Sequence, residues 1–190
     1  MRPVSIYLLL INLIMSNNRV DFEENNYYHI YNRWFEKQII FKSNSDFSKF
    51  YTYVVKYQKE YEGSIKIVAY SFLPNHFHFI FHITETGLNL SNFMRKLQGA
   101  YAMYFKRKYW EKLETGLSNI RWPLFEWRFK AKLIDSDDYL YQCMAYVCFN
   151  ALKHKIVDNI NDYTWTSYHQ LEKNNKVDKY KDLELNDLEF

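Results

Sequence analysis

The hydrophobic residues of this chain fall into two patterns, which together predict four strands and three helices. Apolar or aromatic residues that alternate with polar ones indicate strands, and apolar residues spaced three or four apart indicate helices. In chain order the expected elements are a strand at 25–34, a helix at 43–61, strands at 64–73 and 76–83, a helix at 88–113, a strand at 124–135 and a helix at 139–152.

This order, β-α-β-β-α-β-α, predicts an α+β fold with a ferredoxin-like antiparallel sheet that is covered by helices. The dipeptide Pro74-Asn75 predicts a turn that joins the second and third strands as a hairpin. A chain of 190 residues fits one domain better than two. We therefore expect an N-terminal extension at 1–24, one domain at 25–155 and a C-terminal tail at 156–190.

The N-terminal extension contains "VSIYLLLINLIM", in which ten of twelve residues are apolar. This stretch is as long as a signal-peptide core but too short to span a membrane, and no small-residue cleavage site follows it. Three interpretations stay open: Met15 is the true start, the segment is an apolar arm packed on the domain, or the protein is exported. A membrane span is not expected.

Composition adds a possible partner. Aromatic residues make up 20% of the chain, and the segment 95–132 holds ten Lys or Arg against three Glu, a balance of 10 − 3 = +7. Cations interleaved with aromatic rings suit nucleic acid, although a solvated helix face with core aromatics would look the same. Cys143 and Cys148 lack a CxxC spacing and indicate reduced core thiols of a cytoplasmic protein.

The third expected strand, in "SFLPNHFHFIFHI", holds two histidines one residue apart. Residues two apart on a strand share a face at ~6.6 Å, so His76 and His78 could converge on one metal ion. They could equally be ordinary hydrogen-bonded or exposed sheet histidines. His82 shares that face but lies about 13 Å beyond His78, too far to join such a site.

The last expected helix offers a second group of polar side chains. Tyr146 and Asn150 are four residues apart, so they point the same way beside the apolar stripe of the helix. If this helix packs over the histidine face, a phenol and an amide oxygen approach the two imidazoles. The alternative is a core tyrosine and an asparagine at a helix end. The apolar stripe consists of Leu140, Met144, Val147 and Ala151, and the stripe beside it of Tyr139, Cys143, Tyr146 and Asn150.

Five segments together resemble the single-tyrosine HUH transposases, and most closely the REP-associated tyrosine transposases. The resemblance runs in the right order from about Tyr27 to Tyr168. Its motifs are "YHIYNR" at 28–33, "YSFLPNHFHFIF" at 70–81, "FKAKLIDSDDYL" at 129–140, "AYVCFNALKHKIV" at 145–157 and "YTWTSY" at 163–168. Three positions depart from the family pattern: Trp34 and Trp127 replace glycines, and Ala151 replaces a proline.

The resemblance implies a metal-dependent endonuclease and strand transferase. Carried over to this chain, His76, His78 and Asn150 bind Mg²⁺ or Mn²⁺, and Tyr146 is the nucleophile. The implied substrate is single-stranded DNA that forms hairpins. The resemblance implies that this DNA is cut through a 5′-phosphotyrosine intermediate, in DNA transposition or repeat-element processing.

The basic residues near this expected site are candidates for holding the DNA. A non-catalytic, ferredoxin-like nucleic-acid-binding module remains an alternative, as does a hydrolase in which water attacks instead of tyrosine. We expect a cytoplasmic monomer or homodimer. The candidate DNA-binding residues are Asn32, Arg33, Arg128, Lys130 and Lys132, with the cluster at 95–108 as a further candidate.

Overall fold

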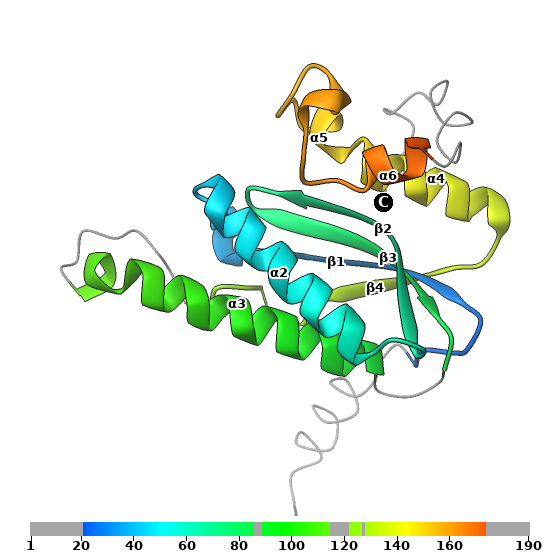
Figure 1. Cartoon of the computed structure of the whole chain (residues 1–190), viewed down its shortest axis with the longest axis horizontal. Helices are drawn as coiled ribbons and strands as arrows, with labels where there is room; N and C mark the ends of the chain where they lie inside the picture. The colour runs from blue at the N-terminus through cyan, green and yellow to red at the C-terminus, as the bar shows by residue number, and fades with distance from the viewer. Residues whose placement is uncertain (1–20, 86–88, 115–121, 127, 174–190) are drawn as a thin grey trace, which may run out of the picture.

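The computed structural model describes residues 21–85, 89–114, 122–126 and 128–173. Four strands form one antiparallel sheet in the order β2-β3-β1-β4, which confirms the predicted α+β fold (Figure 1). The central pair, β1 and β3, is flanked by β2 and by the edge strand β4. The strands are β1 Tyr27–Arg33, β2 Ile65–Leu73, β3 His76–Ile83 and β4 Lys130–Ile134.

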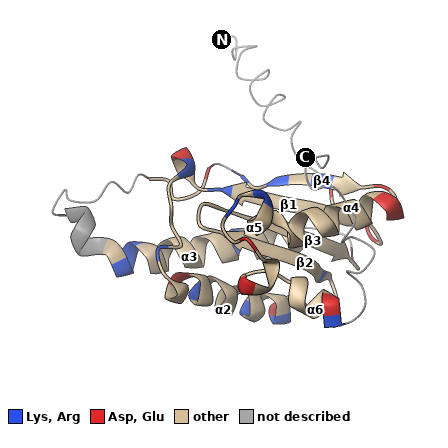
Figure 2. Cartoon of the chain, turned by 90° about the horizontal axis from the view of Figure 1, so that it is seen from above, with Lys and Arg blue, Asp and Glu red and all other residues tan. Residues whose placement is uncertain are grey.

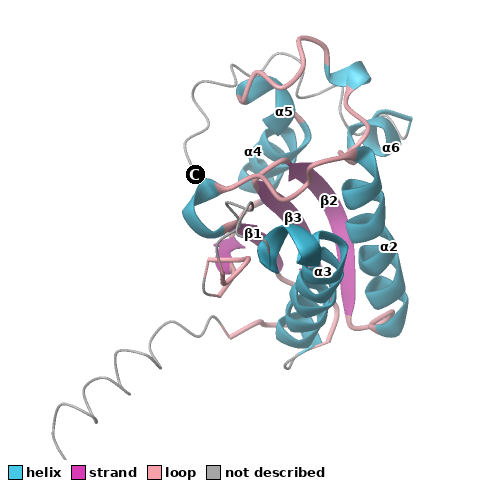
Figure 3. Cartoon of the chain, turned by 90° about the vertical axis from the view of Figure 1, so that its left-hand side faces the viewer, coloured by secondary structure: helices cyan, strands magenta, loops and turns pink. Residues whose placement is uncertain are grey.

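Helices cover both faces of the sheet, so the molecule has three layers (Figure 3). One face of β3 presents Phe77, Phe79 and Phe81 to an aromatic core beneath α2 (Asn44–Glu60) and α3 (Asn89–Glu114). The other face packs against α4 (Asp137–Cys148), α5 (Asn150–Lys153) and α6 (Tyr168–Lys173). Because side chains alternate along a strand, the histidines of β3 lie on the face toward α4.

The last strand is shorter than the sequence predicts. The expected strand at 124–135 is wrong in its first half, because β4 begins only at Lys130. Leu124 and Phe125 are buried in the aromatic core instead, and Phe125 forms an isolated bridge with Trp34. The core therefore holds this segment before the chain reaches the sheet edge. Trp127 lies outside the described residues.

The helix expected at 139–152 is interrupted. Ser136 caps its start, since the Ser136 Oγ accepts a hydrogen bond of 3.3 Å from the backbone N–H of Tyr139. The first helix, α4, ends at Cys148, and Phe149 lies between it and α5 with φ −93° and ψ 9°. Asn150 thus becomes the first residue of α5, where it is fully buried.

The segment after α5 packs on the sheet more closely than a loosely docked tail would. A short 3₁₀ turn, η2 (Ile160–Asp162), leads into a stretch that runs beside β2. There the N–H of Phe72 donates to the carbonyl of Trp165, and the N–H of Ser167 donates to the carbonyl of Tyr70, each at 2.9 Å. This stretch holds α6 against the α4 side of the sheet.

The division of the chain at residues 24 and 155 stays a prediction. The proposed start at Met15 and the apolar segment around it lie outside the described residues. Across the part of the chain that is described, none of the helices combines the length and apolar character needed to cross a membrane.

Candidate active site

Two histidines of β3 lie side by side beneath α4. The ring centroids of His76 and His78 are 5.1 Å apart, with the rings nearly perpendicular. Across the sheet they are paired with Arg33 and Tyr31 of β1, whose side chains share the same face. His78 is buried and His76 is partly exposed, so the pair opens toward solvent on the His76 side.

The hydrogen bonds of His76 fix which ring nitrogen is free to act as a ligand. The amide nitrogen of Asn75 donates to the carbonyl of Lys37 at 3.4 Å, so its amide oxygen faces Nδ1 of His76 at 2.6 Å. An amide oxygen only accepts hydrogen bonds, so Nδ1 of His76 carries the proton and Nε2 has a lone pair. That Nε2 faces Oδ1 of Asn150 at 3.3 Å. Two acceptors facing each other form an arrangement that a shared cation would satisfy.

His78 makes its own hydrogen bond to a third histidine, which sequence reasoning missed. Nδ1 of His78 lies 2.9 Å from Nε2 of His29, a residue of β1 that is only 1% exposed. Metal-binding histidines usually hold a hydrogen-bond partner on the ring nitrogen that does not bind the metal. The motif "YHIYNR" contains this histidine, but only the register of β1 on β3 shows that it meets His78.

Burial keeps these imidazoles neutral. It lowers the pKa of His29 to about 4, and Lys132 acts in the same direction. The pKa of His76 is also lowered to about 4, chiefly by burial and then by the nearby His154. Burial, followed by the neighbouring His29, lowers the pKa of His78 well below its usual value. All three rings are therefore in the neutral form that metal binding requires at neutral pH.

Tyr146 of α4 lies against the histidine face. Its ring is perpendicular to that of His78 at 5.4 Å between centroids, and 6.0 Å from that of His29. Burial raises the pKa of the Tyr146 phenol, while a hydrogen bond with the Asn150 amide opposes this rise. The ammonium of Lys153 lies 5.0 Å from the ring centroid. The phenol thus keeps its proton at neutral pH and has a cation beside it.

The structure brings together all four residues that the sequence proposed for the chemistry: His76, His78, Asn150 and Tyr146. They come from one chain, whose own helices place Tyr146 and Asn150 over its own histidines. Among the described residues, no group of three His, Cys, Asp or Glu side chains is placed to hold a metal ion, so the third ligand expected from the sequence is the amide of Asn150.

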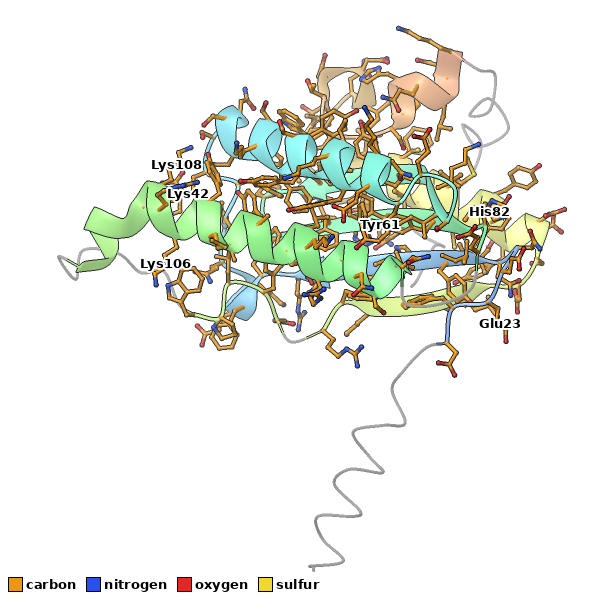
Figure 4. The ribbon with its side chains drawn as sticks, turned by 60° about the horizontal axis from the view of Figure 1, so that its bottom comes forward. Glu23, Lys42, Tyr61, His82, Lys106 and Lys108 are labelled. Atoms are coloured by element: carbon orange, nitrogen blue, oxygen red, sulfur yellow. The ribbon has the colours of Figure 1, made fainter. Side chains whose placement is uncertain are left out.

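Two further histidines differ in their relation to this site. His82 lies at the opposite end of β3 and stacks on Tyr27 at 4.5 Å, as expected for a residue outside the site (Figure 4). His154 follows α5, and its ring centroid is 4.9 Å from that of His76. Sequence reasoning missed His154, because its approach depends on the break between α4 and α5.

The candidate DNA-binding residues are distributed unequally around the site. Lys130 and Lys132 of β4 are paired with Tyr31 and His29 of β1, so they share the histidine face. Figure 2 shows basic positions along β4, which lies beside β1. Arg33 is exposed and forms an ion pair of 2.5 Å with Glu126, and Arg128 is exposed just before β4. Asn32 is buried on the opposite face, so its side chain is directed away from the histidines.

Comparisons with known proteins identify the family and the fold of this chain. The family model described as "Transposase IS200 like" matches residues 23–150. No curated protein matches the chain. Among solved structures, a REP-associated tyrosine transposase bound to a REP hairpin is similar with a TM-score of 0.69 and 15% identity, covering 90% of this chain and 93% of that one.

Two other solved structures have TM-scores below 0.5 and support no argument. One is a Deinococcus radiodurans R1 protein described as a candidate transposase, with a TM-score of 0.43 and 11% identity over 75% of this chain and 96% of that one. The other is a bacterial tRNA(His) guanylyltransferase-like protein in complex with GTP, with a TM-score of 0.42 and 12% identity over 82% and 79%. The family match spans more than half of the chain and confirms the predicted resemblance: this protein belongs to the IS200-like transposase family.

Proposed function

We propose that the protein cuts and rejoins single-stranded DNA through a covalent bond to Tyr146. The supporting observation is the convergence of a tyrosine, two neutral histidines and an amide oxygen on one face of the sheet. A binding module without catalysis would not need a half-buried phenol against paired imidazoles. Membership of a transposase family supports the same reading.

His76, His78 and Asn150 would hold a divalent metal ion, Mg²⁺ or Mn²⁺. The fit rests on the lone pair of the His76 Nε2, which faces the amide oxygen of Asn150 at 3.3 Å. A bound metal ion would draw charge from the scissile phosphate and make it a better electrophile. Imidazole ligands favour Mn²⁺ over Mg²⁺, whereas the amide oxygen suits both.

Tyr146 supplies the nucleophile of the proposed step. A bond forms between its phenolic oxygen and phosphorus, and the bond between phosphorus and the 3′ oxygen of the preceding nucleotide breaks. The phenol loses its proton and the leaving 3′ oxygen gains one, so the products are a 5′-phosphotyrosine and a free 3′-hydroxyl. The phosphodiester energy is conserved, and a second 3′-hydroxyl can reverse the step without ATP.

The structural similarity supports a proposal for the substrate class. The solved transposase with the same fold is bound to a REP hairpin. We propose that this chain acts on hairpin-forming DNA with a single-stranded flank, in the cytoplasm. Lys130 and Lys132, beside the histidine face, are placed to contact the phosphates of that flank.

A covalent adduct tests the proposal. The protein is incubated with Mn²⁺ and labelled single-stranded hairpin DNA, and the products are separated on a denaturing gel. Tyr146→Phe should abolish the adduct, because phenylalanine lacks the attacking oxygen. Tyr31→Phe is the matched control, since the Tyr31 ring also lies against His78, at 5.7 Å.

The pair of variants distinguishes three outcomes. Loss of the adduct in Tyr146→Phe alone supports the proposal, and loss in Tyr31→Phe alone would transfer the role to Tyr31. Cleavage without any adduct in the wild-type protein would indicate a hydrolase in which water attacks.

A further inference from the structure

A second basic surface lies on the side of the sheet away from the histidines. An open groove of about 420 Å³ lies between the N-terminal half of α2 and the C-terminal half of α3. Three cations and several hydroxyl groups line it, and none of the described residues that line it is a carboxylate. The lining residues are Ser45, Ser48, Lys49, Thr52, Tyr104, Arg107 and Lys108.

A buried carboxylate beneath this groove organises its wall. Asp46 is fully buried and accepts hydrogen bonds from Tyr104 at 3.0 Å, from Tyr109 at 2.9 Å and from Lys108 at 2.5 Å. Burial alone would raise the pKa of Asp46, but these hydrogen bonds outweigh it and lower the pKa. Asp46 therefore stays charged and holds α3 against α2.

The groove keeps a net positive charge after this pairing. Counted over the described side chains alone, three lining cations against the one carboxylate of Asp46 leave 3 − 1 = +2. Among the described residues, neither Lys49 nor Arg107 forms an ion pair with a carboxylate. The ammonium of Lys49 instead lies 5.1 Å from the ring of Tyr53 and 6.0 Å from that of Tyr104. Cations set among hydroxyls and aromatic rings are typical of surfaces that follow a nucleic-acid backbone.

The groove and the histidines lie at the same end of the molecule. The carbonyl of Pro74, two residues before His76, accepts hydrogen bonds from the N–H groups of Ile40 at 3.1 Å and Phe41 at 3.3 Å. The next residue, Lys42, lies beside Lys108 at the start of α2 (Figure 4). A DNA strand that leaves the histidines around this end of the sheet would therefore be directed toward the groove.

We propose that the α2–α3 groove binds the phosphodiester backbone of the DNA that flanks the cleavage point. This inference rests on the proposed function, because it assigns a second contact to the same substrate. One DNA molecule then contacts both faces of the protein, with its scissile phosphate at the histidines and its flank in the groove.

Binding measured without catalysis tests this surface. A fluorescein-labelled DNA hairpin with a single-stranded flank is titrated in EDTA over a series of salt concentrations, with anisotropy as the readout. The double variant Lys49→Ala/Arg107→Ala should bind about tenfold more weakly near 0.1 M salt. Loss of two phosphate contacts should also reduce the slope of log K against log salt by about 1.4 to 1.8.

The matched control is Lys56→Ala/Lys59→Ala. Both lysines are exposed on α2 outside the groove, so this variant removes the same amount of charge but leaves the groove intact. It should bind within about twofold of the wild-type protein, as distant charges are screened at this ionic strength. Wild-type affinity and salt slope in the groove variant would overturn the proposal. So would an equal loss in the control, because the effect would then be one of total charge.

The same measurements separate this proposal from the covalent chemistry. Tyr146→Phe should retain full binding in EDTA, and at saturating DNA the groove variant should still form the adduct. If no adduct forms with any protein but the groove variant still binds weakly, only the catalytic proposal fails. If the adduct forms and groove binding is unaffected, only the groove proposal fails.

Discussion

At the scale of single residues, hydrogen bonds decide which atoms of the candidate site can bind a metal ion. Asn75 fixes the proton of His76 on Nδ1, and His29 contacts Nδ1 of His78 at 2.9 Å. For His78 to present Nε2 to a metal ion, its Nδ1 must carry the proton and donate to His29. In the proposed metal site, His29 would be a positioning residue that orients His78 without touching the ion.

His29→Leu should weaken Mn²⁺ binding by about 10- to 100-fold, because His78 would lose the partner that fixes its ring. Electron paramagnetic resonance of free Mn²⁺ during titration, without DNA, measures the affinity directly. His82→Leu is the control, since His82 is on the same face of β3 but stacks on Tyr27 away from the site. Equal Mn²⁺ affinity in His29→Leu and the wild-type protein would show that the contact does not support the site.

Acid should destabilise the metal-free protein. The pKa of His29 is about 4 in the folded protein, whereas an unperturbed histidine, as in the unfolded chain, has a pKa of 6.5. Between these two pH values, His29 binds a proton in the unfolded chain but not in the folded protein. The stability that depends on a neutral His29 is fully present above pH 6.5 and is lost as the pH falls toward 4. The pKa difference of 6.5 − 4 = 2.5 corresponds to about 3 kcal/mol in the free energy of unfolding. Urea unfolding in EDTA at several pH values measures this dependence. His29→Gln should flatten it, and an unchanged pH dependence in that variant would contradict the assignment.

At the scale of helices and strands, the accuracy of sequence-based prediction depends on whether local or distant residues set the boundaries. The strand at 76–83 has the predicted bounds, because the Pro74-Asn75 turn and the alternation are local signals. The break after α4 depends on distant residues: the hydroxyl of Thr166 bonds the carbonyl of Cys148 at 3.2 Å, and Tyr168 packs on Phe149. No pattern within 139–152 indicates these partners.

Asp46→Ala should destabilise the protein by about 3 kcal/mol, because it removes the buried acceptor that joins α2 to α3 and leaves the Lys108 ammonium without its partner. Urea unfolding gives the change in the free energy of unfolding. Ser48→Ala, two residues later and exposed, should change it by less than about 0.5 kcal/mol. A loss below about 1 kcal/mol in Asp46→Ala would mean that the aromatic core alone holds the two helices together.

At the scale of the whole molecule, the sheet separates two functional surfaces. The face toward α4 holds the histidines and Tyr146, whereas the face toward α2 and α3 holds the aromatic core and the basic groove beyond it. The sequence motifs could propose the candidate residues for the chemistry, since each lies in a short local pattern. They could not place Asn32 on the buried face or bring His29 and His154 to the site, because both outcomes depend on strand register and helix packing.

The most direct measurement is the identity of the residue that becomes bonded to DNA. After reaction with Mn²⁺ and hairpin DNA, nuclease and trypsin digestion should leave a nucleotide remnant on the peptide from Leu133 to Lys153, and fragmentation in the mass spectrometer should place it on Tyr146. That peptide also contains Tyr139 and Tyr141, which serve as internal comparisons. A remnant on either of them, on the separate peptide that contains Tyr31, or on no tyrosine at all would contradict the account.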